Sequence, residues 1–259
     1  MGVDISDEQI EDFGDKEYVL ERIIKELNVQ FNTRKQLLLK TLYAYIANSS
    51  ALDDLDCFSM FGTNSFNMVW EKVCAEVLDN QLQKPIGGLR LPVPLAEQYH
   101  DMRYKKLIDL IDKPQWSGTA PNGEPFVKQA EDTLIPDLIS IVNVDGHCQF
   151  IIFDAKYYNI QLEHNKKLRG QPGIESITKQ YLYQLVYQPF VDAHQIGTVK
   201  NCFLMPTEMS EIIEKGSVSL AMMKRLGLED IQVRLLPAKT VFTHYLKNTK
   251  LDIQDLNLR

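Results

Sequence analysis

Two aspartates and one lysine near the middle of the chain have the types and the spacing for metal-assisted hydrolysis. Asp137 precedes an apolar run, Asp154 and Lys156 end the next apolar run, and Asp145-Gly146 lies between the two runs. An Asp-Gly pair in that position predicts a β-hairpin with a two-residue turn. The turn places Asp137 directly opposite Asp154, and because side chains alternate along a strand, Lys156 shares their face. The register alone therefore predicts a cluster of two carboxylates and one ammonium group.

Such a cluster is costly unless a cation occupies it. Neighbouring carboxylates repel and raise each other's pKa, and a divalent cation removes that cost. Mg²⁺ prefers oxygen ligands and is commonly held by one or two carboxylates, while a nearby lysine can orient a water molecule and offset charge on a phosphate. The cluster predicts phosphodiester hydrolysis with Mg²⁺ as cofactor and Mn²⁺ as a substitute. A surface hairpin whose charges are only solvated is the alternative on the residues alone.

The residues around this cluster match a known signature. Pro-Asp at 136–137 followed by Asp-Ala-Lys at 154–156 resembles the PD-(D/E)XK nuclease superfamily. The stretches FDAKYY at 153–158 and FGTNSFNMVWEKVC at 61–74 are similar to the LlaJI-type restriction endonuclease family, related to the nuclease subunit of McrBC-like systems. The resemblance extends over roughly residues 55 to 205. It implies cleavage of double-stranded DNA.

The resemblance also assigns roles to the residues of the hairpin. It implies that Asp137, Asp154 and the backbone carbonyl of Ala155 are ligands of Mg²⁺. It further implies that Lys156 orients the attacking water.

Two further site residues are implied from outside the hairpin. Apolar residues at helical spacing predict a helix over residues 66–78, and the resemblance makes Glu71 on this helix an additional metal ligand. A flanking charge paired with a neighbouring lysine is the alternative for Glu71. A second helix is predicted over residues 174–187 and ends before Pro189. The resemblance implies that Gln180 on this helix reaches the active site, and a solvated helix position is the alternative.

Charge predicts where DNA binds and that the chain needs a partner. The formal net charge is -7, which argues against strong DNA binding by the chain alone. Lys166, Lys167, Arg169 and Lys179 form a local basic segment that can neutralise phosphates, although a solvated loop fits these residues equally well. The sequence has no phosphate-binding loop for nucleotides, and the resemblance implies a McrB-like GTPase of the AAA+ class as partner. A dimer on DNA is also considered.

The predicted fold is α/β and restriction-endonuclease-like. A mixed β-sheet centred on the hairpin at 134–158 is flanked by the two helices described above. Residues 1–60 form an N-terminal helical segment, with helices at 16–28 and 33–48, and residues 61–259 form the nuclease domain. That domain contains an insertion rich in Pro and Gly at 83–125, further strands at 200–205 and 231–236, and a helix near 218–226.

The hypothesis that follows is a Mg²⁺-dependent DNA endonuclease, the cleavage subunit of a restriction-modification system. The alternative is a catalytically inactive scaffold with the nuclease fold that bridges DNA and a motor subunit. The sequence has no apolar run long enough for a membrane span and no signal-peptide pattern at its start, so we expect a cytoplasmic location.

Overall fold

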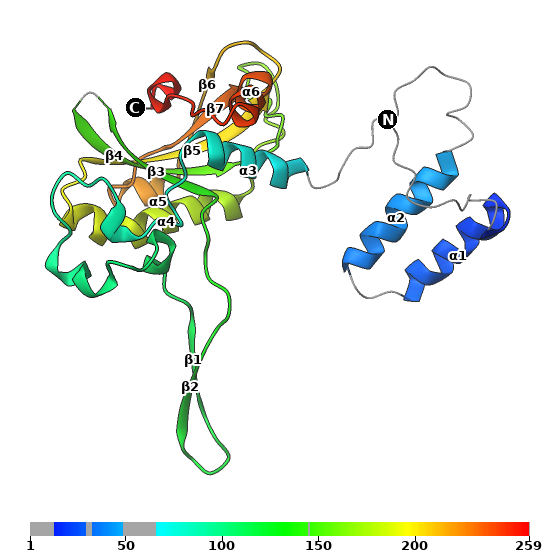
Figure 1. Ribbon diagram of the computed structural model, residues 1–259, viewed down its shortest axis with the longest axis horizontal. Coiled ribbons are helices and arrows are strands. Elements are labelled where there is room, and N and C mark those ends of the chain that lie inside the picture. The colour runs from blue at the N-terminus through cyan, green and yellow to red at the C-terminus, as the bar shows by residue number, and fades with distance from the viewer. Residues whose placement is uncertain (1–12, 30–32, 49–65, 145, 259) are drawn as a thin grey trace. The chain divides into compact units, whose positions relative to one another are not determined.

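The computed structural model describes residues 13–29, 33–48, 66–144 and 146–258 (Figure 1). These residues belong to two compact units, which divide the chain after Gly62. The first unit holds helices α1 (Lys16–Val29) and α2 (Thr33–Asn48), as predicted. Nζ of Lys16 donates to the backbone carbonyl of Ala47 at 3.0 Å, so the start of α1 contacts the end of α2.

The second unit is built on a mixed five-stranded sheet. Its order is β3-β4-β5-β7-β6, in which β4, β5 and β7 are parallel and the two outer strands are antiparallel to their neighbours. The strands are β3 (Leu138–Val144), β4 (His147–Ala155), β5 (Thr198–Thr207), β6 (Ile213–Val218) and β7 (Ile231–Pro237). The prediction of a sheet centred on the hairpin is wrong, because all later strands add on the β4 side and leave β3 at one edge. The mixed α/β class is confirmed.

The hairpin register is the one that the Asp-Gly turn predicts. Val144 pairs with His147, and the same register continues to Leu138 and Phe153. Gly146 has a φ of 83°, a conformation that glycine adopts without strain. Asp145, the other predicted turn residue, lies outside the described residues.

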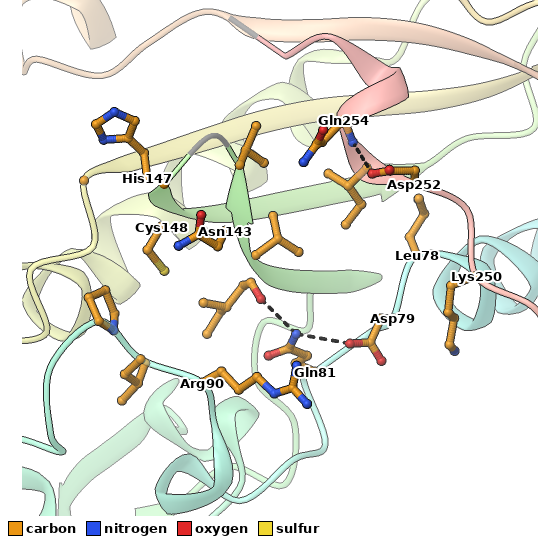
Figure 2. Close-up of a pocket in the computed structure, with 18 of the residues that line it drawn as sticks. Leu78, Asp79, Gln81, Arg90, Asn143, His147, Cys148, Lys250, Asp252 and Gln254 are labelled. Carbon is orange, nitrogen blue, oxygen red and sulfur yellow. Dashed lines mark hydrogen bonds between the residues drawn. The ribbon is translucent and has the colours of Figure 1, made fainter.

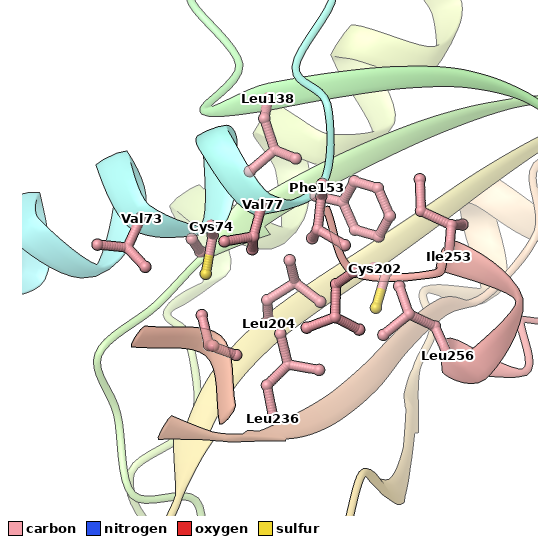
Figure 3. Packing of buried hydrophobic residues seen from close by; sticks show 14 of the residues in the cluster. Val73, Cys74, Val77, Leu138, Phe153, Cys202, Leu204, Leu236, Ile253 and Leu256 are labelled. Carbon is pink, nitrogen blue, oxygen red and sulfur yellow. The ribbon is translucent and has the colours of Figure 1, made fainter. Parts of the chain in front are cut away.

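Helices cover both faces of the sheet. On one face α3 (Phe66–Val77) and α6 (Ala238–Leu246) pack over Phe153, Leu204 and Leu236, which Figure 3 shows from close by. On the other face α4 (Ile174–Ala193) packs against β4 and β5. The alternation of side chains along β4 therefore sends Phe153 to the α3 face and Asp154 to the α4 face.

Helix α4 does not end before Pro189, contrary to the prediction. It continues to Ala193, because Phe190 and Val191 are buried in the core on the α4 side of the sheet. Burial of these side chains outweighs the hydrogen bond that a proline removes.

Two strand pairings and several short helices complete the unit. Strand β6 was not predicted, and neither was the ribbon of β1 (Gln115–Thr119) and β2 (Pro125–Gln129), which extends away from the sheet in Figure 1. The short helices are η3 (Ile86–Gly88), η4 (Glu97–Met102), η5 (Leu107–Leu110), α5 (Ala221–Lys224) and η6 (Ile253–Leu256). Among the described residues, no helix has the length and hydropathy needed to cross a bilayer.

Candidate active site

The two predicted aspartates lie next to each other at the open end of the β3–β4 hairpin, opposite its turn. Asp137 immediately precedes β3, and Asp154 is the residue of β4 after the Leu138–Phe153 pair. Oδ2 of Asp137 accepts a hydrogen bond from the backbone N–H of Ala155 at 2.9 Å. Asp154 is only 7% exposed. Burial, and after it the negative charge of Asp137, raise the pKa of Asp154 to about 7.

Lys156 completes the predicted cluster. Its Nζ lies 2.5 Å from Oδ1 of Asp154, and its backbone N–H donates to the carbonyl of Leu204 on β5. Burial acts to lower the pKa of Lys156, but contact with Asp154 and the charges of Asp137 and Glu71 outweigh burial and raise it. The lysine is therefore held charged beside the two carboxyl groups.

Glu71 lies near this cluster without joining it directly. Burial raises the pKa of Glu71 first, then the charge of Asp137 raises it further, while Lys156 lowers it. The alternative for Glu71 was a flanking charge paired with a neighbouring lysine. The two nearby lysines have other partners, because Lys72 pairs with Glu76 and Lys84 pairs with Asp79. Within the described part of the chain, no three His, Cys, Asp or Glu side chains are arranged to hold a metal ion. Direct contact of Glu71 with a shared metal is therefore not preformed.

Gln180 is not a solvated helix position. It is fully buried on α4, and neither its Oε1 nor its Nε2 has a hydrogen-bond partner among the described residues. An unpaired buried amide is costly, so this side chain is available to a ligand or a water molecule. The structure does not bond it to Asp137, Asp154 or Lys156.

Two residues that sequence reasoning missed hold the backbone on either side of Asp137. The hydroxyl of Tyr183 on α4 donates to the carbonyl of Ile135 at 2.9 Å. Burial and the charges of Asp137 and Asp154 raise the pKa of Tyr183 above its usual value, so it stays a donor. Tyr183 was not predicted as a site residue, because it is one position short of the tyrosine that the family spacing places four residues after Gln180 and its partner is 48 residues away in the chain.

The second of these residues is Asn80, which follows α3. Its Nδ2 lies 3.4 Å from the carbonyl of Asp137, and its Oδ1 accepts from the N–H groups of Ile139 and Leu82 at 3.1 and 3.0 Å. Asn80 thus connects the end of α3 to the start of β3. An asparagine just after a predicted helix often bonds nearby backbone groups, so the sequence indicated this role only weakly.

The predicted basic residues differ in how free their charges are. Lys166 pairs with Glu163 and Lys179 pairs with Glu175, each at 2.6 Å. Lys167 and Arg169 form no ion pair within the described residues. The loop is predicted correctly as irregular, with a single bridge between the backbones of Gln161 and Arg169.

A pocket among the described residues lies away from the cluster of two aspartates and Lys156. A cavity of about 1020 Å³ lies at the turn end of the β3–β4 hairpin, and its lining includes Asp79, Arg90, Asn143 and His147 (Figure 2). None of its lining residues belongs to the Asp137, Asp154 and Lys156 cluster.

The fold and the cluster define a mixed α/β protein with an acidic site where an edge hairpin begins. The sequence profile described as LlaJI restriction endonuclease matches residues 1–92 and 96–239. The chain belongs to the LlaJI restriction endonuclease family, which confirms the resemblance seen in the sequence.

One curated relative is the type II restriction enzyme BsuMI component YdjA of Bacillus subtilis (strain 168). It is 30% identical over 237 residues, which cover 90% of this chain and 44% of the relative. The chain therefore spans less than half the length of that protein. No solved structure matches the chain.

Proposed function

We propose that this chain cleaves the phosphodiester bonds of double-stranded DNA as the Mg²⁺-dependent endonuclease component of a restriction system. Membership of the LlaJI family and the name of the Bacillus relative support the restriction role. The observation that carries the proposal is the buried Asp154 carboxyl, set beside Asp137 and 2.5 Å from Lys156. Charged groups are buried together at such cost mainly where they do chemistry.

The donor atoms fit a hard divalent cation. Asp137 and Asp154 would hold it, with the carbonyl of Ala155 as a third ligand and Glu71 acting through water. A cation here would relieve the repulsion that raises the pKa of Asp154. When bound, Mg²⁺ or Mn²⁺ would polarise the phosphate and make a water molecule more acidic.

The side chains of the site would divide the remaining work. Lys156 would orient the attacking water and offset negative charge on the phosphate oxygens. Asn80 and Tyr183 would fix the backbone on either side of Asp137. The unpaired amide of Gln180 would bond to substrate or water inside the complex.

DNA binding would depend on a second subunit. The net charge of -7 opposes binding to a polyanion, and the free charges of the basic loop are Lys167 and Arg169 among its described residues. A McrB-like AAA+ GTPase would supply grip and energy, and two copies of the chain would cut the two strands as a dimer on DNA.

An inactive scaffold is the competing proposal. The observation in its favour is that no three-residue metal cluster is preformed in the described part of the chain. Against it stands the cost of keeping Asp154 beside Asp137, which a scaffold has no need to bear.

The decisive experiment combines cleavage with metal binding. Asp154→Asn and Lys156→Ala should lower Mg²⁺-dependent cleavage of plasmid DNA roughly a hundredfold or more. Mg²⁺ at ten times its Kd should stabilise the wild type by about 1.4 kcal/mol in thermal unfolding and leave Asp154→Asn unchanged. Asp230→Asn, which breaks the exposed Lys224–Asp230 pair, is the matched control and should behave as wild type. Cleavage by Asp154→Asn at the wild-type rate would disprove the proposal.

A further inference from the structure

The β1–β2 ribbon carries an exposed aromatic residue that the proposed site does not use. Trp116 is 71% exposed, whereas the other tryptophan of the chain, Trp70, is fully buried. All five residues of β2 are exposed, and so are four of the five in β1. The ribbon extends away from the sheet in Figure 1, so packing against the protein does not explain its side chains.

The ribbon is ordered along its length. Five residue pairs connect its strands, the ladder continues at the base through a bond from Ala130 N–H to the carbonyl of Pro114, and Ala120 and Glu124 close the tip. The side chain of Thr133 donates to the carbonyl of Asp112 below the base. The ribbon is therefore a preformed arm rather than a flexible loop.

One face of the arm combines aromatic rings with a positive charge. The register places Trp116 opposite Lys128 and Gly118 opposite Phe126, so these four residues share a face. The Phe126 ring lies over Gly118, where a Cβ atom would come within 2.7 Å of the ring. Nζ of Lys128 is 5.6 Å from the centre of the same ring.

The opposite face carries uncharged hydrogen-bonding groups. Gln115, Ser117, Thr119 and Gln129 lie there, together with Val127. Lys128 is the only charged residue in the ten strand positions, and Glu124 lies at the tip between the two strands, so the arm is neutral overall while the chain has a net charge of -7. The apolar surface of the arm is divided, because Val127 lies on one face and Trp116 and Phe126 lie on the other, where the ammonium group of Lys128 accompanies them. A charged group within so small an apolar patch is unlike the core of an interface that a protein partner buries.

We propose that the β1–β2 ribbon is an arm that enters the major groove of duplex DNA, an inference that rests on the proposed function. The major groove admits a two-stranded ribbon, and strands of five residues are about 17 Å long, more than the depth of the groove. Amide and hydroxyl groups on one face match the donors and acceptors of base edges. Lys128 and Trp116 lie on the opposite face of the ribbon, toward the sugar-phosphate backbone, where Lys128 contacts a phosphate and Trp116 packs on apolar sugar atoms.

The position of the arm in the chain links it to the site. Residues 130–136 connect the end of β2 directly to Asp137, and Tyr183 fixes this segment at Ile135. A duplex bound by the arm is therefore connected to Asp137 through this short segment of the chain.

Binding is tested without cleavage, using a fluorescent duplex and the purified chain in EDTA at low salt. Trp116→Ala should weaken DNA binding about tenfold, because the apolar surface that the ring buries in the complex is lost. Lys128→Ala should reduce the slope of log affinity against log salt by about 0.9, the value for one phosphate contact. Tyr104→Ala is the matched control, because Tyr104 is an exposed aromatic residue beside Arg103 and lies outside the arm. It should bind as wild type.

Tryptophan fluorescence gives an independent readout. Acrylamide reaches the exposed Trp116 and not the buried Trp70, so duplex DNA should protect the emission from quenching. Unchanged affinity in both arm variants, unchanged quenching, or no DNA binding by the wild type would overturn the proposal. A chain that binds through the arm and does not cleave with Mg²⁺ would refute the nuclease assignment alone. Cleavage that is insensitive to the arm variants would refute the arm alone.

Discussion

At the scale of single residues, the candidate site concentrates electrostatic cost in one carboxyl group. Asp154 is buried, faces the charge of Asp137, and is only partly compensated by Lys156. An aspartate in an unfolded chain titrates near pH 3.9, so the two states bind protons differently over the range up to about pH 7.

This difference predicts a pH-dependent stability in EDTA. Because the folded state binds more protons than the unfolded state between about pH 4 and 7, the free energy of unfolding should fall as the pH rises through this range, by about 4 kcal/mol. Urea unfolding at several pH values measures it. Asp154→Asn should lose this slope and Asp230→Asn should keep it. An equal slope in Asp154→Asn would mean that another group is responsible.

Tyr183 offers a test of how firmly Asp137 must be held. Tyr183→Phe removes the hydroxyl that bonds the carbonyl of Ile135, so kcat should fall about tenfold with KM unchanged, while the Mg²⁺ concentration for half-maximal activity rises. Tyr187→Phe is the control. Tyr187 lies one turn further along α4, and its hydroxyl donates to the carbonyl of Leu107, away from Asp137. Both variants should lose about 1 kcal/mol of stability. Equal activity in the two variants would show that Tyr183 has only a structural role.

At the scale of elements, the basic loop depends on one backbone position. Gly170 has a φ of 64°, and a Cβ atom there would lie 2.2 Å from the carbonyl oxygen of Asn159. Gly227 also has a positive φ, of 77°, but has open space around it. Alanine at position 170 would therefore add a steric clash to the backbone strain, whereas alanine at position 227 would add backbone strain alone.

Gly170→Ala should disrupt the loop while the sheet stays folded. We expect trypsin to cleave the variant faster after Lys166, Lys167 and Arg169, and DNA binding to weaken. Gly227→Ala should cost about 1 kcal/mol from its backbone conformation and leave loop cleavage by trypsin at the wild-type rate. Unchanged proteolysis in Gly170→Ala would show that the loop tolerates the side chain.

The elements also show how far sequence reasoning reaches. The hairpin register, α3 and the two N-terminal helices were predictable because a turn type or an apolar period defines them locally. The passage of α4 through Pro189 was not, since distant core contacts of Phe190 and Val191 decide it. Tyr183 and Asn80 were missed for the same reason, because each acts through a partner remote in the chain. The ribbon was missed because β1 lies within the segment rich in Pro and Gly at 83–125 and β2 begins at its last residue.

At the scale of the whole molecule, the net charge opposes binding of the chain to DNA, its proposed substrate. A net charge of -7 predicts weak and strongly salt-dependent binding to DNA when the chain is alone. Association with a partner that grips DNA would remove this limit.

The partner model makes a defined prediction. The chain alone should nick DNA weakly, and a cognate GTPase with GTP should convert nicking to double-strand breaks, measured on plasmid gels. Lys167→Ala with Arg169→Ala should lose cleavage and keep partner binding. Lys166→Ala should retain most activity, because Lys166 is already paired with Glu163. Efficient sequence-specific cutting without nucleotide would refute the partner model and leave the nuclease proposal standing.

Strands β3 and β4 are neighbours in the chain and pair as a hairpin, whereas β4 and β5 pair in parallel and are separated in the chain by the whole of α4. Hairpins close within about 1–10 μs, and non-local parallel pairing is slower. Asp137 and Asp154 are thus brought together early, while water still screens their repulsion. The cost arises later, when α4 and β5 dock and exclude that water. Repulsion between the carboxylates should therefore hardly slow hairpin closure and should speed unfolding of the finished protein, so the acidic site shortens the lifetime of its own native state.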